Sequence, residues 1–211
     1  MTESSPAFAR DLKTAWYYDK RAAEYDEWYE SRGRFADQDR PGWTAEVAGL
    51  IELVRRLPVA RTLDVACGSG FLTRHLRGVV VGLDQSRAMI ALARQRLSEG
   101  VSLVGHALEL PFVNGGFDRV LTSHFYGHLP SEERNAFLAE VRRVAAELVV
   151  IDSALRPGID AAQWQERVLN DSSRHRVYKR YLSAAQLATE IGGQILLDGT
   201  WFVAAQRIER H

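Results

Sequence analysis

The residues best placed for chemistry lie in one short segment, Asp64-Val-Ala-Cys-Gly68-Ser-Gly70. This segment follows an apolar, strand-like run and precedes a run with helical spacing. Glycine at such a turn lets the backbone approach a ligand, because no Cβ stands in the way. Asp84 comes twenty residues after Asp64, at the end of the next strand-like run. A carboxylate at that place can accept hydrogen bonds from both hydroxyl groups of a ribose, so we expect a nucleoside to bind here.

Two classes of cofactor share this layout. The dinucleotide fingerprint G-x-G-x-x-G requires a third glycine, and Thr73 occupies that position. The missing glycine argues against a dinucleotide-dependent oxidoreductase. Asp64, directly before the turn, suits a cofactor with an amine to bind. S-adenosylmethionine has a ribose, an adenine and an amino-acid end but no phosphate, and it is the cofactor that these residues favour.

A second group follows the fourth expected strand, in the run Ser123-His124-Phe-Tyr126-Gly-His128. His124 and His128 are four residues apart and would share one face if a helix started here. Histidine titrates near neutral pH, and a hydroxyl nucleophile benefits from such a base. We predict His124 and His128 as catalytic, Ser123 beside the cofactor and Tyr126 in the substrate wall. Packing of one histidine against the turn is the alternative, and a metal site is not favoured because no third ligand is evident.

A third group is the basic run from Arg174 to Tyr181. It is unusual in a chain whose 27 basic and 27 acidic residues cancel. Arg176 and Lys179 are predicted to bind the substrate, as an anion clamp for a carboxylate or phosphonate. The alternative is a solvated basic strand, in which alternation places Arg176 on one face and Lys179 on the other.

The elements that must position these residues alternate between strand and helix, which predicts a parallel sheet covered by helices on both faces. Towards the C-terminus, Asp198-Gly199 separates two strand-like runs and predicts an antiparallel last strand. Thr44, Ser86 and Ser131 are predicted to cap helices. Strands are expected at 61–65, 79–83, 101–105, 117–122, 148–152, 194–197 and 201–206, and helices at 11–29, 44–57, 71–76, 86–97 and 131–144.

Length and composition place limits on the function. A chain of 211 residues with 46% hydrophobic and 26% charged residues is typical of one globular domain. A net charge of zero gives no broad surface for nucleic acid. Residues 1–13 are too polar for a signal peptide, and no apolar run is long enough for a membrane helix. We therefore expect a cytoplasmic protein with a small-molecule substrate and no nucleic-acid or membrane partner.

From about Tyr17 onward the chain resembles the class I S-adenosylmethionine-dependent methyltransferases. The resemblance rests on the runs TLDVACGSG, VVGLDQSRAMIALAR, LVGHALELPF and FDRVLTSHFYGHL. It implies a Rossmann-like three-layer α/β sandwich with a seven-stranded, mostly parallel sheet and an antiparallel C-terminal strand. The expected organisation is one domain, 1–211, with an N-terminal helical cap at 1–43 and a substrate-side insertion at 153–192.

The resemblance also implies a cofactor site. Gly68 and Gly70 would contact the methionine part of S-adenosylmethionine, with Asp84 on the ribose. Ala66 stands where the family usually has a glycine, and His106 where it often has an acidic residue; His106 as a surface residue without ligand contact is the alternative. The remaining residues implied to bind the cofactor are Tyr25, Gln85, Met89, Ala107 and Leu108.

A narrower resemblance concerns bacterial small-acid methyltransferases, including phosphonate O-methyltransferases. The shared features are the His124 and His128 pair, the R-x-x-K step of Arg176 and Lys179, and the terminal hairpin. They favour O-methylation of an anionic metabolite. A nucleic-acid or protein methyltransferase is the alternative, although the fourth strand lacks the Asn/Asp-Pro-Pro-aromatic motif of nucleic-acid enzymes. A non-catalytic S-adenosylmethionine-binding protein is the third possibility.

Overall fold

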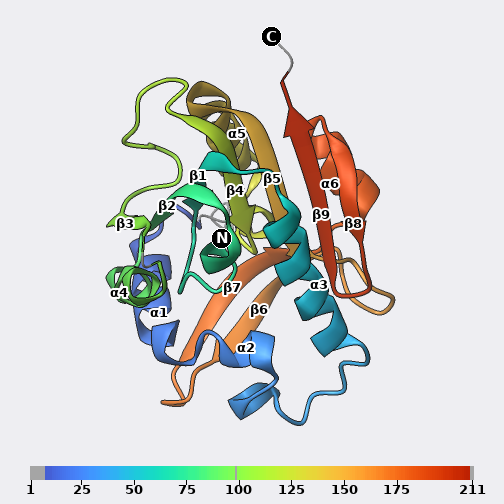
Figure 1. Ribbon diagram of the computed structural model, residues 1–211. Helices are drawn as coiled ribbons and strands as arrows, with labels where there is room; N and C mark the ends of the chain where they lie inside the picture. The colour runs from blue at the N-terminus through green and yellow to red at the C-terminus, as the bar shows by residue number, and fades with distance from the viewer. Residues whose placement is uncertain (1–7, 98, 210–211) are drawn as a thin grey trace.

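Seven strands form one sheet in the spatial order β3-β2-β1-β4-β5-β9-β8 (Figure 1) in the computed structural model, which describes residues 8–97 and 99–209. The first five of these strands run parallel, and β9 is antiparallel to both β5 and β8. This topology confirms the predicted α/β fold and its antiparallel C-terminal strand. The strands are β1 (Ala60–Val65), β2 (Gly78–Asp84), β3 (Val101–Val104), β4 (Phe117–Ser123), β5 (Ala145–Ser153), β8 (Gln194–Asp198) and β9 (Phe202–Ile208).

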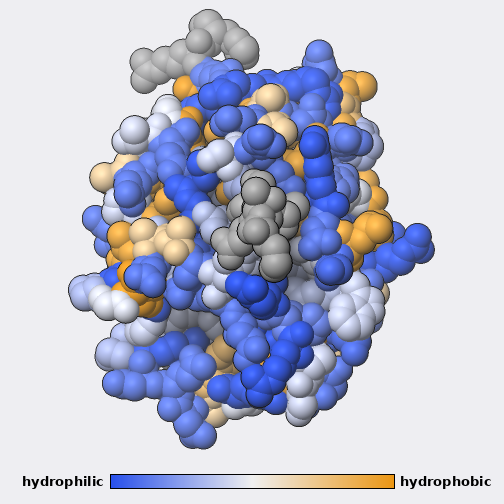
Figure 2. All heavy atoms as spheres, turned by 180° about the vertical axis from the view of Figure 1, so that it is seen from behind, coloured by the Kyte–Doolittle hydropathy of each residue, from blue (hydrophilic) through white to orange (hydrophobic). Residues whose placement is uncertain are grey.

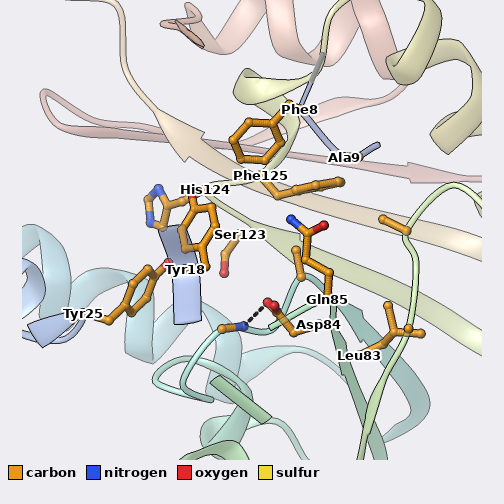
Figure 3. Close-up of a pocket in the computed structure, with 14 residues that line it drawn as sticks. Phe8, Ala9, Tyr18, Tyr25, Leu83, Asp84, Gln85, Ser123, His124 and Phe125 are labelled. Atoms are coloured by element: carbon orange, nitrogen blue, oxygen red, sulfur yellow. Dashed lines mark hydrogen bonds between the residues drawn. The ribbon is translucent and has the colours of Figure 1, made fainter. Parts of the chain in front are cut away.

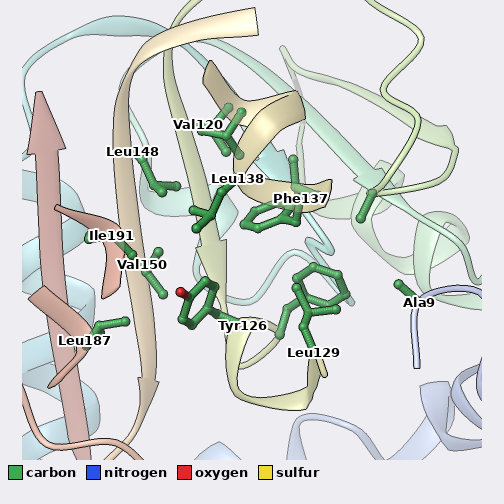
Figure 4. Close-up of a cluster of buried hydrophobic side chains, with 14 of the residues drawn as sticks. Ala9, Val120, Tyr126, Leu129, Phe137, Leu138, Leu148, Val150, Leu187 and Ile191 are labelled. Carbon is green, nitrogen blue, oxygen red and sulfur yellow. The ribbon is translucent and has the colours of Figure 1, made fainter. Parts of the chain in front are cut away.

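Helices cover both faces of this sheet. The helices of the described residues are α1 (Leu12–Arg21), α2 (Glu27–Glu30), α3 (Trp43–Arg56), α4 (Arg87–Arg96), α5 (Ser131–Val144) and α6 (Ala184–Ile191). Alternate side chains of β5 point to opposite faces of the sheet and pack in two separate clusters of the core. Leu148 and Val150 pack in the cluster that includes Leu187 of α6 (Figure 4), whereas Val149 packs with Leu50 of α3. A shift of register by one residue would therefore exchange the two faces of β5, so the strand is held firmly in place.

Two of the three predicted helix caps are wrong. Helix α3 begins after Gly42, whose φ of 77° turns the chain, and the expected cap Thr44 lies inside the helix. Helix α5 follows Pro130, and no side chain caps it, Ser131 included. Only Ser86 acts as predicted, because its Oγ accepts the backbone N–H three residues later at 3.1 Å.

The helix expected at 71–76 is a single 3₁₀ turn, η3 (Thr73–His75). The crossover from the end of β1 at Val65 to the start of β2 at Gly78 has twelve residues, and the glycine turn occupies several of them. A parallel crossover needs about a dozen residues in all. The remaining length is therefore too short for an α-helix.

The helix expected at 11–29 is broken into α1, the 3₁₀ turn η1 (Ala22–Glu24) and α2. Two acidic side chains of this segment, one in α1 and one after the 3₁₀ turn, reach the loops at the edge of the sheet. Asp19 Oδ1 accepts a 2.6 Å hydrogen bond from Ser86 Oγ, and Asp26 Oδ1 accepts one of 2.6 Å from Ser69 Oγ. These contacts hold the N-terminal segment over the carboxyl ends of β1 and β2.

A second, two-stranded sheet lies beyond the same edge, near α1 and α2 in Figure 1. It consists of β6 (Ala162–Val168) and β7 (Arg174–Arg180), which run antiparallel. β7 is the predicted basic strand, whereas β6 was not expected from the sequence. Helix α6 was also missed, although Ser183 and Gln186 form a reciprocal capping box at its start.

Hydrophilic side chains cover most of the face shown in Figure 2, and the hydrophobic ones are scattered over it. None of the described helices has both the length and the apolar character that a membrane span requires.

Candidate active site

Four neighbouring strands supply the candidate site, because their carboxyl ends meet at one edge of the sheet. Val65 ends β1, Asp84 ends β2, Ser123 ends β4 and Ser153 ends β5. The loops that follow these strands therefore face a common space below the N-terminal segment.

The glycine turn after β1 is built from left-handed residues. Ala66, Gly68 and Gly70 have φ values of 58°, 55° and 79°. A Cβ on Gly70 would lie 3.3 Å from the Cα of Ala93, so glycine there allows α4 to approach closely. Alanine in this conformation costs about 1–2 kcal/mol, and such strain is typically stored at functional sites. The turn is shaped for a ligand as well as for the fold.

A cavity with about 510 Å³ of empty space adjoins this turn (Figure 3), and we call it the nucleoside pocket. Phe8 and Phe125 lie across it from Asp84, while Tyr18 and His124 close one end. The residues that line it are Phe8, Ala9, Tyr18, Tyr25, Ala66, Gly68, Leu83, Asp84, Gln85, Gly105, Ala107, Ser123, His124 and Phe125.

Asp84 is the only carboxylate among the described residues that line the nucleoside pocket. Its Oδ2 accepts the Gly68 N–H at 3.0 Å and its Oδ1 accepts the Ser86 N–H at 2.8 Å. Burial raises the pKa of this carboxyl to about 6, although the backbone hydrogen bonds oppose the rise. Each oxygen has a second lone pair, so ionised Asp84 can still accept two hydroxyl groups.

Asp64 lies behind the glycine turn and does not line the pocket. Its Oδ2 accepts a 2.6 Å hydrogen bond from Thr73 Oγ1, whereas Oδ1 is buried without a partner among the described residues. Burial raises the pKa of Asp64 to about 7. A buried acceptor of this kind calls for a donor, and a ligand amine or a bridging water would supply one.

The other lining groups restrict what can bind in the nucleoside pocket. None of the described residues that line it is lysine or arginine, so a phosphate would find no cationic partner. Tyr18, Tyr25 and Phe125 present aromatic rings, whose faces attract cations. These lining residues suit a nucleoside that carries a positively charged group and no phosphate.

A second cavity, the inner chamber, borders the nucleoside pocket and shares Tyr18, Tyr25 and His124 with it. Its empty space is about 340 Å³, part of which is open to solvent. Its other lining residues are Arg21, Trp28, His128, Ser153, Arg167 and Lys179. Three cationic side chains thus surround a space that opens beside the nucleoside pocket.

His124 stands between the two cavities. Its backbone is left-handed, with φ of 55°, and both ring nitrogens are buried without a partner among the described residues. Burial lowers the pKa of His124 to about 3. The ring is therefore neutral at pH 7 and offers one donor and one acceptor to a ligand.

His128 has a different environment. Its Nδ1 lies 2.6 Å from the Tyr178 carbonyl oxygen, so Nδ1 carries the proton and donates it. Burial lowers the pKa of His128 well below its ordinary value, which leaves Nε2 as an unprotonated acceptor. The ring of Phe8 stacks on it at 4.6 Å. His128 is the more tightly fixed of the two histidines.

Lys179 forms a buried ion pair with Asp152 at the end of β5. Asp152 Oδ2 also accepts the Gly127 N–H at 2.7 Å, and it is fully buried. Burial opposes ionisation, but Lys179 and these donors hold the pKa of Asp152 below its usual value. In contrast, Arg21 and Arg167 have no carboxylate oxygen within 4 Å among the described residues. The inner chamber therefore has excess positive charge.

The structure brings some of the predicted cofactor residues together and leaves others apart. Those that line the nucleoside pocket are Tyr25, Ala66, Gly68, Asp84, Gln85, Ala107 and Ser123. Those outside its lining are Asp64, Gly70, Met89, His106 and Leu108. Met89 is fully buried, and His106 Nδ1 is buried without a partner among the described residues. Their roles remain predictions.

The predicted substrate residues also separate. Lys179 lines the inner chamber. Arg176 lies on the opposite face of β7, where its guanidinium packs over the Trp164 ring at 5.3 Å. Tyr126 is fully buried, and its hydroxyl donates to Glu190 at 3.1 Å. Strand alternation explains why Arg176 and Lys179 do not meet.

Sequence inspection missed several residues of the two cavities. Asp152, which lines neither cavity but pairs with Lys179, ends a predicted strand, so the rule that found Asp84 applied to it as well. No local signal marked Phe8, Arg21 or Arg167, because each reaches the site only through tertiary packing.

Comparison with known proteins matches residues 63–148 to the family described as "Methyltransferase domain". A demethylmenaquinone methyltransferase of Thermotoga maritima is 33% identical over 100 residues, which are 45% of this chain and 43% of that protein. Ajmaline N-methyltransferase of Rauvolfia serpentina is 31% identical over 172 residues, 69% of this chain and 56% of that one. The chain thus spans about half the length of these curated relatives.

The solved structure of DhpI in complex with SAH is similar over almost the whole chain. It covers 93% of this chain and 96% of DhpI, with a TM-score of 0.71 and 26% identity. The similarity therefore extends well beyond residues 63–148, into the N-terminal helices and the C-terminal strands.

Proposed function

The chain carries a class I S-adenosylmethionine-dependent methyltransferase domain, and from this premise we propose that it methylates an oxygen atom of a small anionic metabolite. The observation that carries the proposal is the inner chamber, where three cationic side chains and a neutral His124 adjoin the nucleoside pocket. We further propose that residues 1–43, of which 1–7 lie outside the described residues, form a cap and that 153–192 form a substrate-side insertion on this single domain.

The nucleoside pocket fits S-adenosylmethionine in three respects. Asp84 offers acceptors to the ribose, the lining lacks lysine and arginine for a phosphate, and Tyr18 and Tyr25 offer aromatic rings to a cationic sulfur. When bound, S-adenosylmethionine supplies a methyl group activated by positive charge on that sulfur. The chain then has to bind the acceptor in line, exclude water and accept a proton.

Charge favours an anionic substrate with an oxygen acceptor. Arg21, Arg167 and Lys179 attract a carboxylate or phosphonate and would repel a protonated amine. Only Lys179 has a carboxylate partner among the described residues, so the two arginines are available to bind the anion. The hydroxyl to be methylated would then lie beside His124.

The anion itself would increase the basicity of His124. In the free protein, burial holds the pKa of His124 at about 3, which makes it a weak base. A negative charge nearby favours the protonated form of a histidine and raises its pKa. The substrate thus prepares its own proton acceptor, and a neutral analogue would not.

The test is a turnover assay that detects S-adenosylhomocysteine release with matched pairs of small hydroxy compounds. Each pair consists of a hydroxy-carboxylate or hydroxy-phosphonate and its neutral amide or ester. We expect turnover of anionic members only, with the new methyl group on oxygen. Arg167→Gln should raise KM more than it lowers kcat, because anion binding is shared by ground and transition states. Preference for the neutral members, or for amines, would overturn the proposal.

A further inference from the structure

A wide cavity open to solvent leads to the inner chamber from outside, and we call it the outer vestibule. Its empty space is about 1970 Å³, part of which is open solvent, and it shares Arg21, Trp28, Ser153, Arg167 and Lys179 with the inner chamber. Four of the five tryptophans of the chain line it: Trp28, Trp43, Trp164 and Trp201. A molecule longer than the inner chamber would extend along this route.

The outer vestibule contains three arginines that the proposed methyl transfer does not use, and two of them, unlike Arg34 with its hydrogen bond to Asn170, pack on tryptophan rings. Arg40 and Arg156 line it but are absent from the lining of the inner chamber. Within residues 8–97 and 99–209, neither guanidinium has a carboxylate oxygen within 4 Å. In a chain with equal numbers of acidic and basic residues, two neighbouring cations without a carboxylate need an explanation.

Arg40 is held rigidly. Its guanidinium carbon lies 3.9 Å from the centre of the Trp43 ring, and its terminal nitrogens donate to the Trp28 carbonyl at 3.1 Å and to Ser31 Oγ at 2.9 Å. Its Nε is buried and has no partner among the described residues. One donor of a pre-organised cation is therefore free.

Arg156 stacks in the same way on a neighbouring indole. Its guanidinium carbon lies 4.0 Å from the centre of the Trp201 ring, which meets the Trp43 ring edge to face at 5.4 Å. Glu46 is the nearby carboxylate, but it accepts the backbone N–H groups of the turn before β9, including that of Trp201 at 2.9 Å. The guanidinium of Arg156 makes no hydrogen bond with a described residue.

The guanidinium of Arg40 is affected by burial and by the charge of Arg156. Burial lowers the pKa of Arg40, and the positive charge of Arg156 lowers it further. Two like charges that lie close together in a partly buried environment repel each other, and an anion bound between them would offset this repulsion. Because both side chains are already fixed against tryptophan rings, binding costs little side-chain entropy.

We propose that Arg40 and Arg156 bind a second anionic group of the substrate, a carboxylate or a phosphate, at the mouth of the outer vestibule. This inference rests on the proposed function, since it places the methyl acceptor in the inner chamber. The substrate is then an elongated molecule with an anionic group at each end. Its middle part lies against the aromatic rings of the outer vestibule, and a flat or ring-bearing middle fits them best.

The test uses phenyl phosphate as the probe, with the wild-type protein saturated with S-adenosylhomocysteine. Phenol and inorganic phosphate serve as comparison compounds. Indole N–H signals in ¹H–¹⁵N NMR report the place of binding, and Trp201→Phe and Trp43→Phe assign the two relevant signals. We expect phenyl phosphate to shift the signals of Trp201 and Trp43. Trp16 lies outside the vestibule lining, and its signal should stay in place.

Arg156→Gln is the main variant, because the side chain of Arg156 supports no loop. The affinity for phenyl phosphate, measured from the shift of the Trp201 signal, should fall at least tenfold in this variant. Arg156→Lys keeps the charge but loses the planar fork, so its loss should be smaller. Arg34→Gln removes the same charge from the vestibule wall, where Arg34 is bonded to Asn170, and should change the affinity less than twofold. If the Arg34 and Arg156 variants lose the same affinity for phenyl phosphate, the anion is attracted by the overall positive charge of the vestibule and not bound at a specific site. No weakening by Arg156→Gln would also overturn the proposal.

Two further results separate this inference from the proposed function. If phenyl phosphate binds through Arg156 but no hydroxy compound is methylated, the anion site stands and the proposed function fails. If anionic hydroxy compounds are methylated with the same KM in Arg156→Gln, including those with a second anionic group, the proposed function stands and the anion site fails. Arg167→Gln should leave the Trp201 shift unchanged, because we assign Arg167 to the anionic group beside the methyl acceptor and not to the second anionic group.

Discussion

Replacement of Asp84 by asparagine should have opposite effects on cofactor affinity and on stability. The side chain accepts two backbone N–H groups and faces the nucleoside pocket, where we expect it to accept the ribose hydroxyls. Asparagine keeps the shape but has one carbonyl oxygen and no charge. The variant should therefore bind S-adenosylhomocysteine more weakly while the cofactor-free protein becomes more stable.

The loss of affinity follows from the lost charged acceptor. A hydrogen bond to a charged group contributes about 1.5–3 kcal/mol, which corresponds to roughly 10- to 150-fold in Kd. The pH dependence adds a second signature. Because the pKa of Asp84 is about 6 in the free protein, about a tenth of it is ionised at pH 5. Wild-type affinity should then fall roughly tenfold from pH 8 to pH 5, and Asp84→Asn should lack this dependence.

The gain of stability follows from the raised pKa. The carboxyl has a pKa of about 6 in the folded protein against 3.8 as its ordinary value. Between these values the folded state holds more protons than the unfolded state, so stability falls as pH rises through this window. At about 1.4 kcal/mol per pKa unit, the buried carboxylate lowers the free energy of unfolding by about 3 kcal/mol above pH 6. Asp84→Asn also loses one backbone hydrogen bond, which costs about 1 kcal/mol. The free energy of unfolding of the variant should therefore rise by about 2 kcal/mol in total.

Two assays check both halves of this prediction. Calorimetric titration with S-adenosylhomocysteine from pH 5 to pH 8 measures affinity, and urea unfolding of the cofactor-free protein at pH 7.5 and pH 4 measures stability. The stability gain should be present at pH 7.5 and absent at pH 4. Asp64→Asn is the matched control for the stability half only, since its carboxyl is also buried and has a raised pKa. Unchanged affinity in Asp84→Asn would refute the ribose contact, and a net loss of stability at pH 7.5 would refute the argument from burial.

Three further predictions concern other parts of the site. The Glu133 carboxylate accepts the backbone N–H groups of residues 8, 9 and 10 at 3.1, 2.8 and 3.2 Å. Glu133→Ala should therefore lower the free energy of unfolding by roughly 2–3 kcal/mol and speed S-adenosylhomocysteine release in stopped-flow experiments. Replacement of its exposed neighbour, Glu132→Ala, should do neither. Asp152→Asn leaves Lys179 buried without its counter-charge and should lower stability by about 3–5 kcal/mol at pH 7.5; a loss below 1 kcal/mol in urea unfolding would show that the pair is solvated. His124→Asn should lower kcat by about 10²–10⁴-fold with little change in KM if His124 is the base, and a fall of less than threefold would assign His124 to positioning alone.

Local sequence patterns were enough to predict the sheet and one wall of the site. The strand-like run before Asp64 and the glycines after it specify a tight turn at a strand end, and the place of Asp84 follows from the same rule applied to the next strand. Such predictions succeed because hydrophobic periodicity and turn residues act over a few neighbours in the chain. The failed helix at 71–76 shows the limit of this approach, since the length of the crossover, and not its residue pattern, decided the outcome.

The sequence by itself therefore determined the α/β sheet, the antiparallel end, and the turn and carboxylate that face the nucleoside pocket. Only the tertiary structure decided which cations meet at the substrate side. Arg21 from α1, Arg167 from β6 and Lys179 from β7 converge on one chamber, while Arg176, three residues from Lys179, points away. The physical reason is that strand alternation fixes only which residues share a face, whereas the packing of the hairpin and the N-terminal helices over the sheet edge fixes which faces meet.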